Sequence, residues 1–118
     1  MTADITTSGT TLIAKITGEI DHHSAAEIKL RIAEEYTKNS CVDIIFDFSN
    51  LYFMDSAGIG MLIGRYKQVC INGGSVSAAG ISPAIERIFE LSGLTKIIKR
   101  YSTLEAAINS KTNRKEVI

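Results

Sequence analysis

The chain has 118 residues, 45% of them hydrophobic and 22% charged, and its thirteen basic side chains balance thirteen acidic ones. This length suits one domain with a single modest core, and a zero net charge argues against binding to nucleic acid or to an anionic membrane. No apolar run approaches the roughly 18 residues that cross a bilayer, and the amino terminus lacks the pattern of a secretory signal. Cys41 and Cys70 are isolated, which favours reduced thiols in a cytoplasmic protein.

The first forty residues predict a β-hairpin followed by a helix. Residues 4–8 and 10–17 are rich in β-branched side chains, and Gly9 between them is typical of a turn. Ser24, with Glu27 three residues later, predicts a capping box at the start of the helix. One face of this helix is apolar and should be buried; it carries Ala25, Ile28, Ile32 and Tyr36.

The middle of the chain predicts a buried strand and a second helix. Residues 42–48 are apolar enough to lie in the middle of a sheet. Residues 49–55 are expected to form a connector, and residues 56–71 a helix. The apolar residues of that helix recur with helical spacing and should face the sheet: Ile59, Leu62, Ile63, Tyr66, Val69 and Cys70.

The next segment predicts two short strands, residues 75–79 and 96–99, with a helix between them. Ser82 is the expected cap of that helix, Pro83 its first residue, and Gly93 its end.

Ser102, with Glu105 three residues on, should cap a last helix that runs to about residue 110. The remaining residues, 111–118, are polar and are expected to form a frayed tail. Strands that alternate with helices predict a single α/β domain over residues 1–110, with a central, mostly parallel mixed sheet and covering helices.

Asp55 and Ser56 stand where the second helix should begin. The Ser56 hydroxyl should therefore face solvent at the positive end of the helix. Serine is a preferred capping residue, so a purely structural role is the simplest interpretation from the local sequence. A phosphate added at such a position is tolerated by the fold and disrupts a docked partner, so the two interpretations are compatible.

Gly60 and Gly64 follow Ser56 at intervals of four residues and should lie on one face of the helix. Each glycine costs a helix interior about 1 kcal/mol relative to alanine, so a pair of them needs a reason. Close packing within the chain is one hypothesis, and a flat surface along which a partner approaches Ser56 is the other. The spacing alone leaves both open.

Enzymatic chemistry finds little support in the sequence. The glycine pattern that begins at Gly58 has the wrong spacing for a dinucleotide site. The run Asp21-His22-His23 could hold a metal, but no further cluster of ligands accompanies it. Ser56 with a histidine and either Asp21 or Asp55 could form a hydrolase triad, but the nucleophile elbow is missing. We therefore expect neither enzymatic activity nor a cofactor.

Three segments resemble the STAS family. Residues 12–24 are similar to the strand, Gly-Glu-Ile-Asp and helix that open these domains. Residues 47–60 resemble the family's hallmark, in which the serine after the aspartate is phosphorylated, and residues 64–94 extend the likeness. The likeness covers about residues 4–110. The Asp-Ser-Ala-Gly motif is typical of the bacterial anti-sigma antagonist branch of the family. The pair His22-His23 and the Gly-Arg-Tyr-Lys segment resemble the sporulation anti-anti-sigma factors of the forespore sigma-F pathway.

This resemblance implies a partner-switching protein. The unphosphorylated form would bind an anti-sigma factor that is also a serine kinase, and would thereby free a sporulation sigma factor. Phosphorylation of Ser56 would break the complex, and a PP2C-type serine phosphatase would restore it. Ala57 stands where many relatives have a second hydroxyl, which leaves Ser56 as the implied acceptor.

The partner-binding residues implied by the resemblance surround this serine: Asp21, Asp55, Ser56, Ala57, Gly58, Ile59, Gly60 and Gly64. The alternative from a different class is a STAS domain that serves as a structural or nucleotide-sensing module of a stress-response complex.

Overall fold

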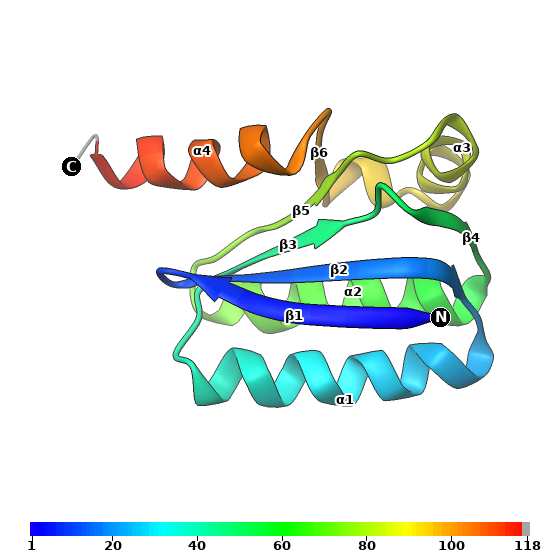
Figure 1. The fold of residues 1–118 in the computed structure, drawn as a ribbon, viewed down its shortest axis with the longest axis horizontal. Coiled ribbons are helices and arrows are strands. Elements are labelled where there is room, and N and C mark those ends of the chain that lie inside the picture. The colour runs from blue at the N-terminus through cyan, green and yellow to red at the C-terminus, as the bar shows by residue number, and fades with distance from the viewer. Residues whose placement is uncertain (117–118) are drawn as a thin grey trace.

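Strands and helices alternate along the chain in the computed structural model, which describes residues 1–116 (Figure 1). The elements in chain order are β1 (Thr2–Ser8), β2 (Thr11–Ile20), α1 (His22–Lys38), β3 (Asp43–Asp47), β4 (Leu51–Met54), α2 (Ser56–Ile71), β5 (Val76–Ala79), α3 (Pro83–Ser92), the 3-10 turn η1 (Leu94–Lys96), β6 (Lys99–Tyr101) and α4 (Leu104–Glu116).

The strands form one mixed sheet in the order β1-β2-β3-β5-β6, with β4 paired to the far end of β2. Only the β1–β2 hairpin is antiparallel; the other pairs are parallel. Figure 1 shows α1 and α2 side by side on one side of the sheet and α4 at the other. The predicted fold, a single α/β domain with a mostly parallel mixed sheet, is confirmed.

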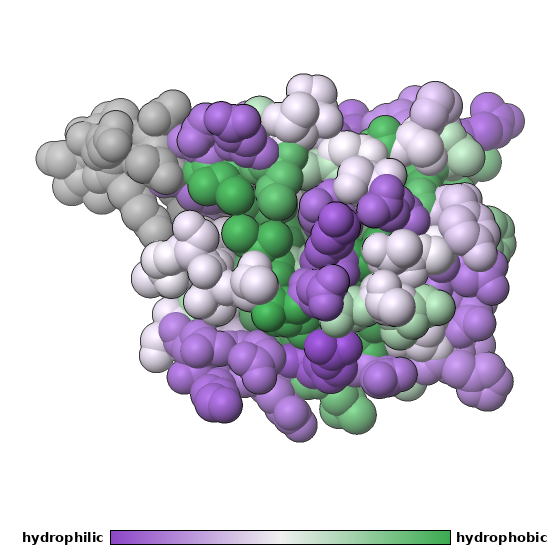
Figure 2. Space-filling model, in the orientation of Figure 1, coloured by the Kyte–Doolittle hydropathy of each residue, from purple (hydrophilic) through white to green (hydrophobic). Residues whose placement is uncertain are grey.

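The core has two parts because both faces of the sheet are covered. Leu12 of β2 belongs to the large cluster under α1, α2 and α3, whereas its neighbour Ile13 packs with Ala107 of α4. Successive side chains of a strand point to opposite faces, so β3, which is buried at every position, needs apolar side chains on both faces, as Ile44, Ile45 and Phe46 provide. Figure 2 shows hydrophobic side chains gathered in the middle of one face, beside α4.

Helix α1 begins earlier than expected. Asp21 is its cap and accepts hydrogen bonds from the backbone N–H groups of His23 and Ser24, while the Ser24 hydroxyl accepts from the Asp21 N–H at 2.8 Å. The predicted cap at Ser24 is therefore wrong by three residues: the serine closes the capping box from inside the helix. The buried face of α1 is confirmed, and it comprises Ala25, Ile28, Ile32 and Tyr36.

Strand β4 lies in the segment predicted to be a connector. It pairs in parallel with β2 beyond the point where β3 ends, and Ile20 is opposite Met54. A shift of register at Gly18, where φ is +102°, accompanies the change of partner. This four-residue strand exists because β2 is long enough to extend past β3, so local sequence could not predict it.

Helix α2 has the predicted bounds, but its buried face differs from the predicted one. Leu62 and Val69 are buried as expected, whereas Cys70 is exposed and Met61 and Arg65 are buried. The reason is that α2 packs against α1 as well as against the sheet, which widens the face that it must bury.

The later elements match the predictions in part. Strand β5 and helix α3 are confirmed, with the Ser82 hydroxyl accepting from the Ile85 N–H and Gly93 at a φ of +82°. The strand predicted over residues 96–99 is displaced: η1 ends at Lys96, and β6 covers Lys99–Tyr101.

Helix α4 also differs from its prediction. Thr103, rather than Ser102, caps it by accepting from the Ala106 N–H at 3.1 Å. The helix continues to Glu116, beyond the expected end near residue 110, and Lys111 is buried. Residues 117–118 of the expected tail lie outside the described residues. None of the helices in residues 1–116 is long and apolar enough to cross a membrane.

Candidate functional site

Helices α1 and α2 begin next to each other at the carboxyl ends of the paired strands β2 and β4. Asp21 and Asp55 each follow directly after one of the paired residues Ile20 and Met54, and the Asp55 N–H donates to the Ile20 carbonyl at 3.1 Å. Each aspartate caps its own helix. Two capped helix starts are thus held side by side by the pairing of β2 with β4.

Ser56 is the first residue of α2, and its side chain is exposed. The cap is Asp55, whose carboxylate accepts from the N–H groups of Ala57 at 2.9 Å and Gly58 at 3.3 Å. The interpretation of Ser56 as the capping residue is therefore wrong. Its hydroxyl is not needed for the cap and lies in solvent at the positive end of the helix.

The neighbouring cap residue, Asp21, carries a well-stabilised negative charge. Hydrogen bonds from the backbone N–H and the hydroxyl of Ser24 lower the pKa of Asp21 below its ordinary value, since hydrogen bonds to a carboxylate favour its charged form. Asp21 therefore holds its negative charge at the start of α1.

The three glycines of α2 have different surroundings. A Cβ atom added at Gly60 or Gly64 would meet no atom within 4 Å. A Cβ at Gly58 would lie 3.0 Å from Met54 Cβ and 3.2 Å from Ile20 Cγ2. Close packing therefore explains Gly58 alone, and the hypothesis that Gly60 and Gly64 pack within the chain is wrong.

The residues singled out from the sequence are brought together around the start of α2. Ser56 and Gly60 are exposed, and five others are half-buried: Asp21, Asp55, Ala57, Ile59 and Gly64. Gly58 is buried and does not contribute side-chain surface.

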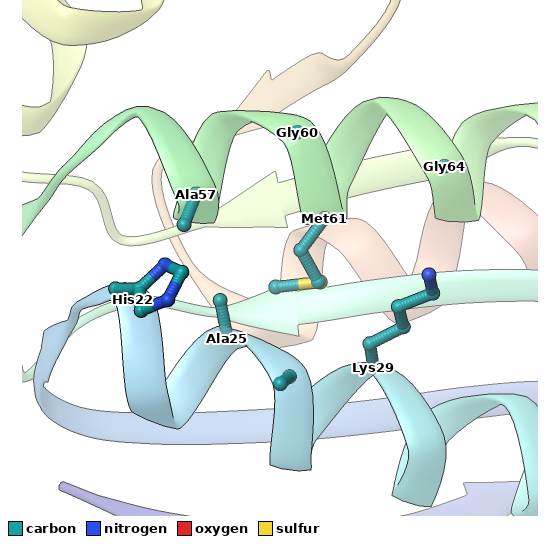
Figure 3. Close-up of a pocket in the computed structure, with 8 residues that line it drawn as sticks. His22, Ala25, Lys29, Ala57, Gly60, Met61 and Gly64 are labelled. Carbon is teal, nitrogen blue, oxygen red and sulfur yellow. The ribbon is translucent and has the colours of Figure 1, made fainter.

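A groove of about 310 Å³ lies between α1 and α2 (Figure 3). We call it the α1–α2 groove. Its lining consists of small residues with one methionine and two basic side chains: His22, Ala25, Ala26, Lys29, Ala57, Gly60, Met61 and Gly64. In Figure 3 the His22 ring lies beside Ala57, and the Lys29 side chain extends from α1 toward the turn of α2 that contains Gly64.

A second hollow, of about 340 Å³, lies on the other side of Ser56 between β4, α2 and α3. We call it the Phe53 hollow. Its lining is mostly apolar and comprises Phe53, Met54, Asp55, Ser56, Ile59, Ile88, Leu91 and Ser92. Phe53 is 47% exposed and Leu91 is 75% exposed. An exposed apolar patch of this kind is typical of an interaction surface.

Sequence reasoning missed the Phe53 hollow. Two signals for it were present, an aromatic residue two positions before Asp55 and the apolar pair Ile88 and Leu91 at helical spacing in α3. Their proximity to Ser56 depends on β4 and α3 lying together, which only the tertiary structure shows.

The histidines occupy the exposed first turn of α1, and their rings meet edge to face with centroids 5.5 Å apart. Among the described residues, no group of three or more histidine, cysteine or acidic side chains could hold a metal ion. The Asp21 carboxylate is engaged in the cap of α1. The metal and hydrolase hypotheses thus gain no support from the structure.

Comparison with known proteins identifies the family. The model of the STAS domain matches residues 2–107, and the chain belongs to the STAS family. The chain is 36% identical over 90 residues to the anti-sigma F factor antagonist of Paenibacillus polymyxa, an alignment that covers 76% of this chain and 77% of the relative. It is 31% identical over 84 residues to the anti-sigma F factor antagonist of Lysinibacillus sphaericus, covering 71% and 72%.

Solved structures show the same fold. The anti-sigma factor antagonist SpoIIAA in its unphosphorylated form superposes with a TM-score of 0.76 at 22% identity, covering 95% of this chain and 98% of that one. The Bacillus cell fate determinant SpoIIAA in its phosphorylated form superposes with a TM-score of 0.74 at 28% identity, covering 92% and 98%.

Proposed function

We propose that this protein is an anti-sigma factor antagonist that is switched by phosphorylation of Ser56. The unphosphorylated form binds an anti-sigma factor with serine kinase activity and so frees a sporulation sigma factor. The kinase phosphorylates Ser56, the complex dissociates, and a PP2C-type phosphatase resets the switch. The protein itself is a cytoplasmic binding module rather than an enzyme.

The observation that carries this proposal is the position of Ser56. Its exposed hydroxyl stands at the first residue of α2, with open glycines about one and two turns further along the helix and a hollow on either side. A kinase can approach a hydroxyl there without displacing side chains of the helix that follows. The relatives named as anti-sigma F factor antagonists, and a phosphorylated form of SpoIIAA among the similar structures, support the same function.

The partner surface of this proposal combines the residues around Ser56 with the Phe53 hollow. The polar part comprises the two caps and the helix start, Asp21, Asp55, Ser56 and Ala57, and the flat part comprises Gly60 and Gly64. Ile59 continues into the Phe53 hollow, where apolar side chains of the partner would be buried. Gly58 acts from the interior by letting α2 approach Ile20 and Met54.

Phosphorylation acts at the interface in this proposal and not by melting α2. A phosphoserine adds a charge of about −1.5 to −2 at pH 7, and a helix start favours such a charge by about 0.3–1 kcal/mol. The fold should therefore remain as stable as before. A partner that accepts a small hydroxyl beside the Asp55 cap meets a dianion instead, with repulsion and desolvation to overcome.

The test uses the anti-sigma factor of the same bacterium, purified, with ATP. Mass spectrometry should find one phosphate on the wild-type protein, and Ser56→Ala should abolish its incorporation. Ser56→Asp should weaken calorimetric binding to the anti-sigma factor by about 2 kcal/mol or more, with its melting temperature close to that of the wild type.

Two outcomes would contradict the proposal. The first is undiminished phosphate uptake by Ser56→Ala. The second is a set of amide chemical-shift changes spread over the whole domain on phosphorylation, which would indicate a conformational switch.

A further inference from the structure

The α1–α2 groove is lined mostly by alanines and glycines and is about two helical turns long. His22 and Lys29, at its two ends on α1, are seven residues apart, as are Ala57 and Gly64 on α2. Seven residues of helix span about 10 Å. Because Gly60 and Gly64 present no side chain and have open space around them, the backbone of another element can approach α2 closely along this length.

The charge of the groove has one sign. Its lining contains two titratable side chains, His22 and Lys29, and no carboxylate from the described part of the chain. Lys29 is exposed, and its side chain runs along the groove (Figure 3).

A third basic side chain, outside the groove's lining, is buried against the main chain of Lys29. Arg65 is only 8% exposed, and its Nη1 donates to the main-chain carbonyl of Lys29 at 3.0 Å. Its Nε has no hydrogen-bond partner. A main-chain carbonyl is neutral, so this hydrogen bond does not cancel the positive charge of the guanidinium. In the low dielectric of the interior, that charge acts over a longer distance than in water.

We propose that the α1–α2 groove receives an α-helix of the anti-sigma factor, with an acidic side chain of that helix paired with Lys29. This inference rests on the proposed function and names the chemistry of the partner along the groove, which runs from Ala57, the residue after Ser56, to Lys29 and Gly64 at its far end. A helix fits because the walls are formed by two neighbouring helices with alanines and glycines, where the apolar face of a third helix can lie. An acidic group fits because Lys29 and Arg65 together attract an anion.

The groove and the phosphorylation site then have separate tasks. Lys29 lies about two turns along α1 from the start of the helix, about 10 Å away, so phosphate at Ser56 does not contact it. The groove supplies affinity in both states, and Ser56 decides between them. Effects at sites this far apart without shared partners are usually additive, so a change at Lys29 should weaken the phosphorylated and unphosphorylated complexes by the same factor.

The experiment is a binding titration of the full chain against the purified anti-sigma factor, with thermal unfolding of each variant as a check of folding. Lys29→Glu should lower the affinity about tenfold, and Lys29→Gln about threefold. Lys96→Glu is the control, since Lys96 is also exposed and lies outside the groove; it should change the affinity less than twofold. Replacing the paired acidic residue of the partner's helix by lysine should restore binding to Lys29→Glu.

The outcomes separate this inference from the proposed function. If the wild type binds, Ser56→Asp does not, and Lys29→Glu binds as well as the wild type, the groove inference is wrong while the switch stands. If the wild type does not bind the anti-sigma factor at all, both are wrong. If Lys29→Glu instead shifts a monomer–dimer equilibrium in sedimentation, a second copy of this chain occupies the groove, and the inference is overturned.

Discussion

The two ends of the parallel strands use polar side chains in opposite ways. At the amino end, Asp43 is fully buried and accepts from the backbone N–H of Ser75 at 2.8 Å, and the Lys111 amino group donates to the Ser75 hydroxyl at 2.7 Å. At the carboxyl end, Asp21 and Asp55 bond to residues two and three positions further on.

The sequence distance of these bonds shows what each end does. The bonds of the amino end join β3, the segment before β5 and α4, which are more than thirty residues apart. Tyr36 and Asn72 add another such link, between the ends of α1 and α2. The side chains of the amino end therefore hold separate elements together. At the carboxyl end, the two aspartates bond only within their own helix starts and leave Ser56 open to a partner.

The largest effect should come from breaking the amino end. Asp43→Ala removes two hydrogen bonds to Ser75 from a fully buried carboxylate and leaves the half-buried Ser75 N–H without its acceptor, so the free energy of unfolding should fall by about 3 kcal/mol. Urea denaturation measures this. Asp4→Ala, at an exposed carboxylate of β1, should change stability by less than about 0.5 kcal/mol. A loss below about 1 kcal/mol for Asp43→Ala would remove the contrast between the two ends.

The glycines of α2 give the next largest effect. Gly58→Ala places a methyl group against Met54 and Ile20, and overpacking should exceed the gain in helix propensity, with a net loss of about 1 kcal/mol. Gly60→Ala meets open space and should stabilise by about the same amount. Paired thermal melts compare them, and a stabilised Gly58→Ala would show that the interior at this end accommodates a side chain.

A smaller effect separates the role of Asp55, the cap of α2, from that of Ser56, the proposed phosphate acceptor. Asp55→Ala removes the cap of α2 and should cost about 1 kcal/mol. Ser56→Ala changes only the first helical residue and should stay within about 0.5 kcal/mol of the wild type. If Ser56→Ala proves to be the more destabilising of the two in chemical denaturation, the assignment of the cap is wrong.

The smallest effect is a dependence on pH. The pKa of Asp21 is lower in the folded protein, so its contribution to stability is present above the ordinary aspartate pKa of about 3.9 and is lost as the pH falls through the folded value. Asp21→Asn should therefore make the free energy of unfolding less dependent on pH below about pH 4. Asp4→Asn controls for the loss of one exposed carboxylate. Identical pH profiles for wild type and Asp21→Asn would show that this carboxylate is not coupled to folding.

The elements that could be predicted from the sequence are those with a local signal. The bounds of α2, the cap and end of α3 at Ser82 and Gly93, and the buried face of α1 follow from periodicity and capping chemistry. The prominence of Ser56 also came from the sequence, because a distinctive motif surrounds it.

The features without a local signal were decided by contacts between segments that are far apart in the chain. Strand β4 forms because β2 extends past β3, and the α1–α2 packing buries Arg65, which no periodicity would place inside. Asp55 and Ser56 are both good capping residues, and the choice between them depends on where the pairing of Met54 with Ile20 ends the strand. The sequence by itself determined the alternation of strands and helices, apart from β4, and the serine at the start of α2. Only the tertiary structure decided that this serine is free of the cap, that Gly60 and Gly64 are open, and that two hollows flank it, because each of these depends on contacts between segments far apart in the chain.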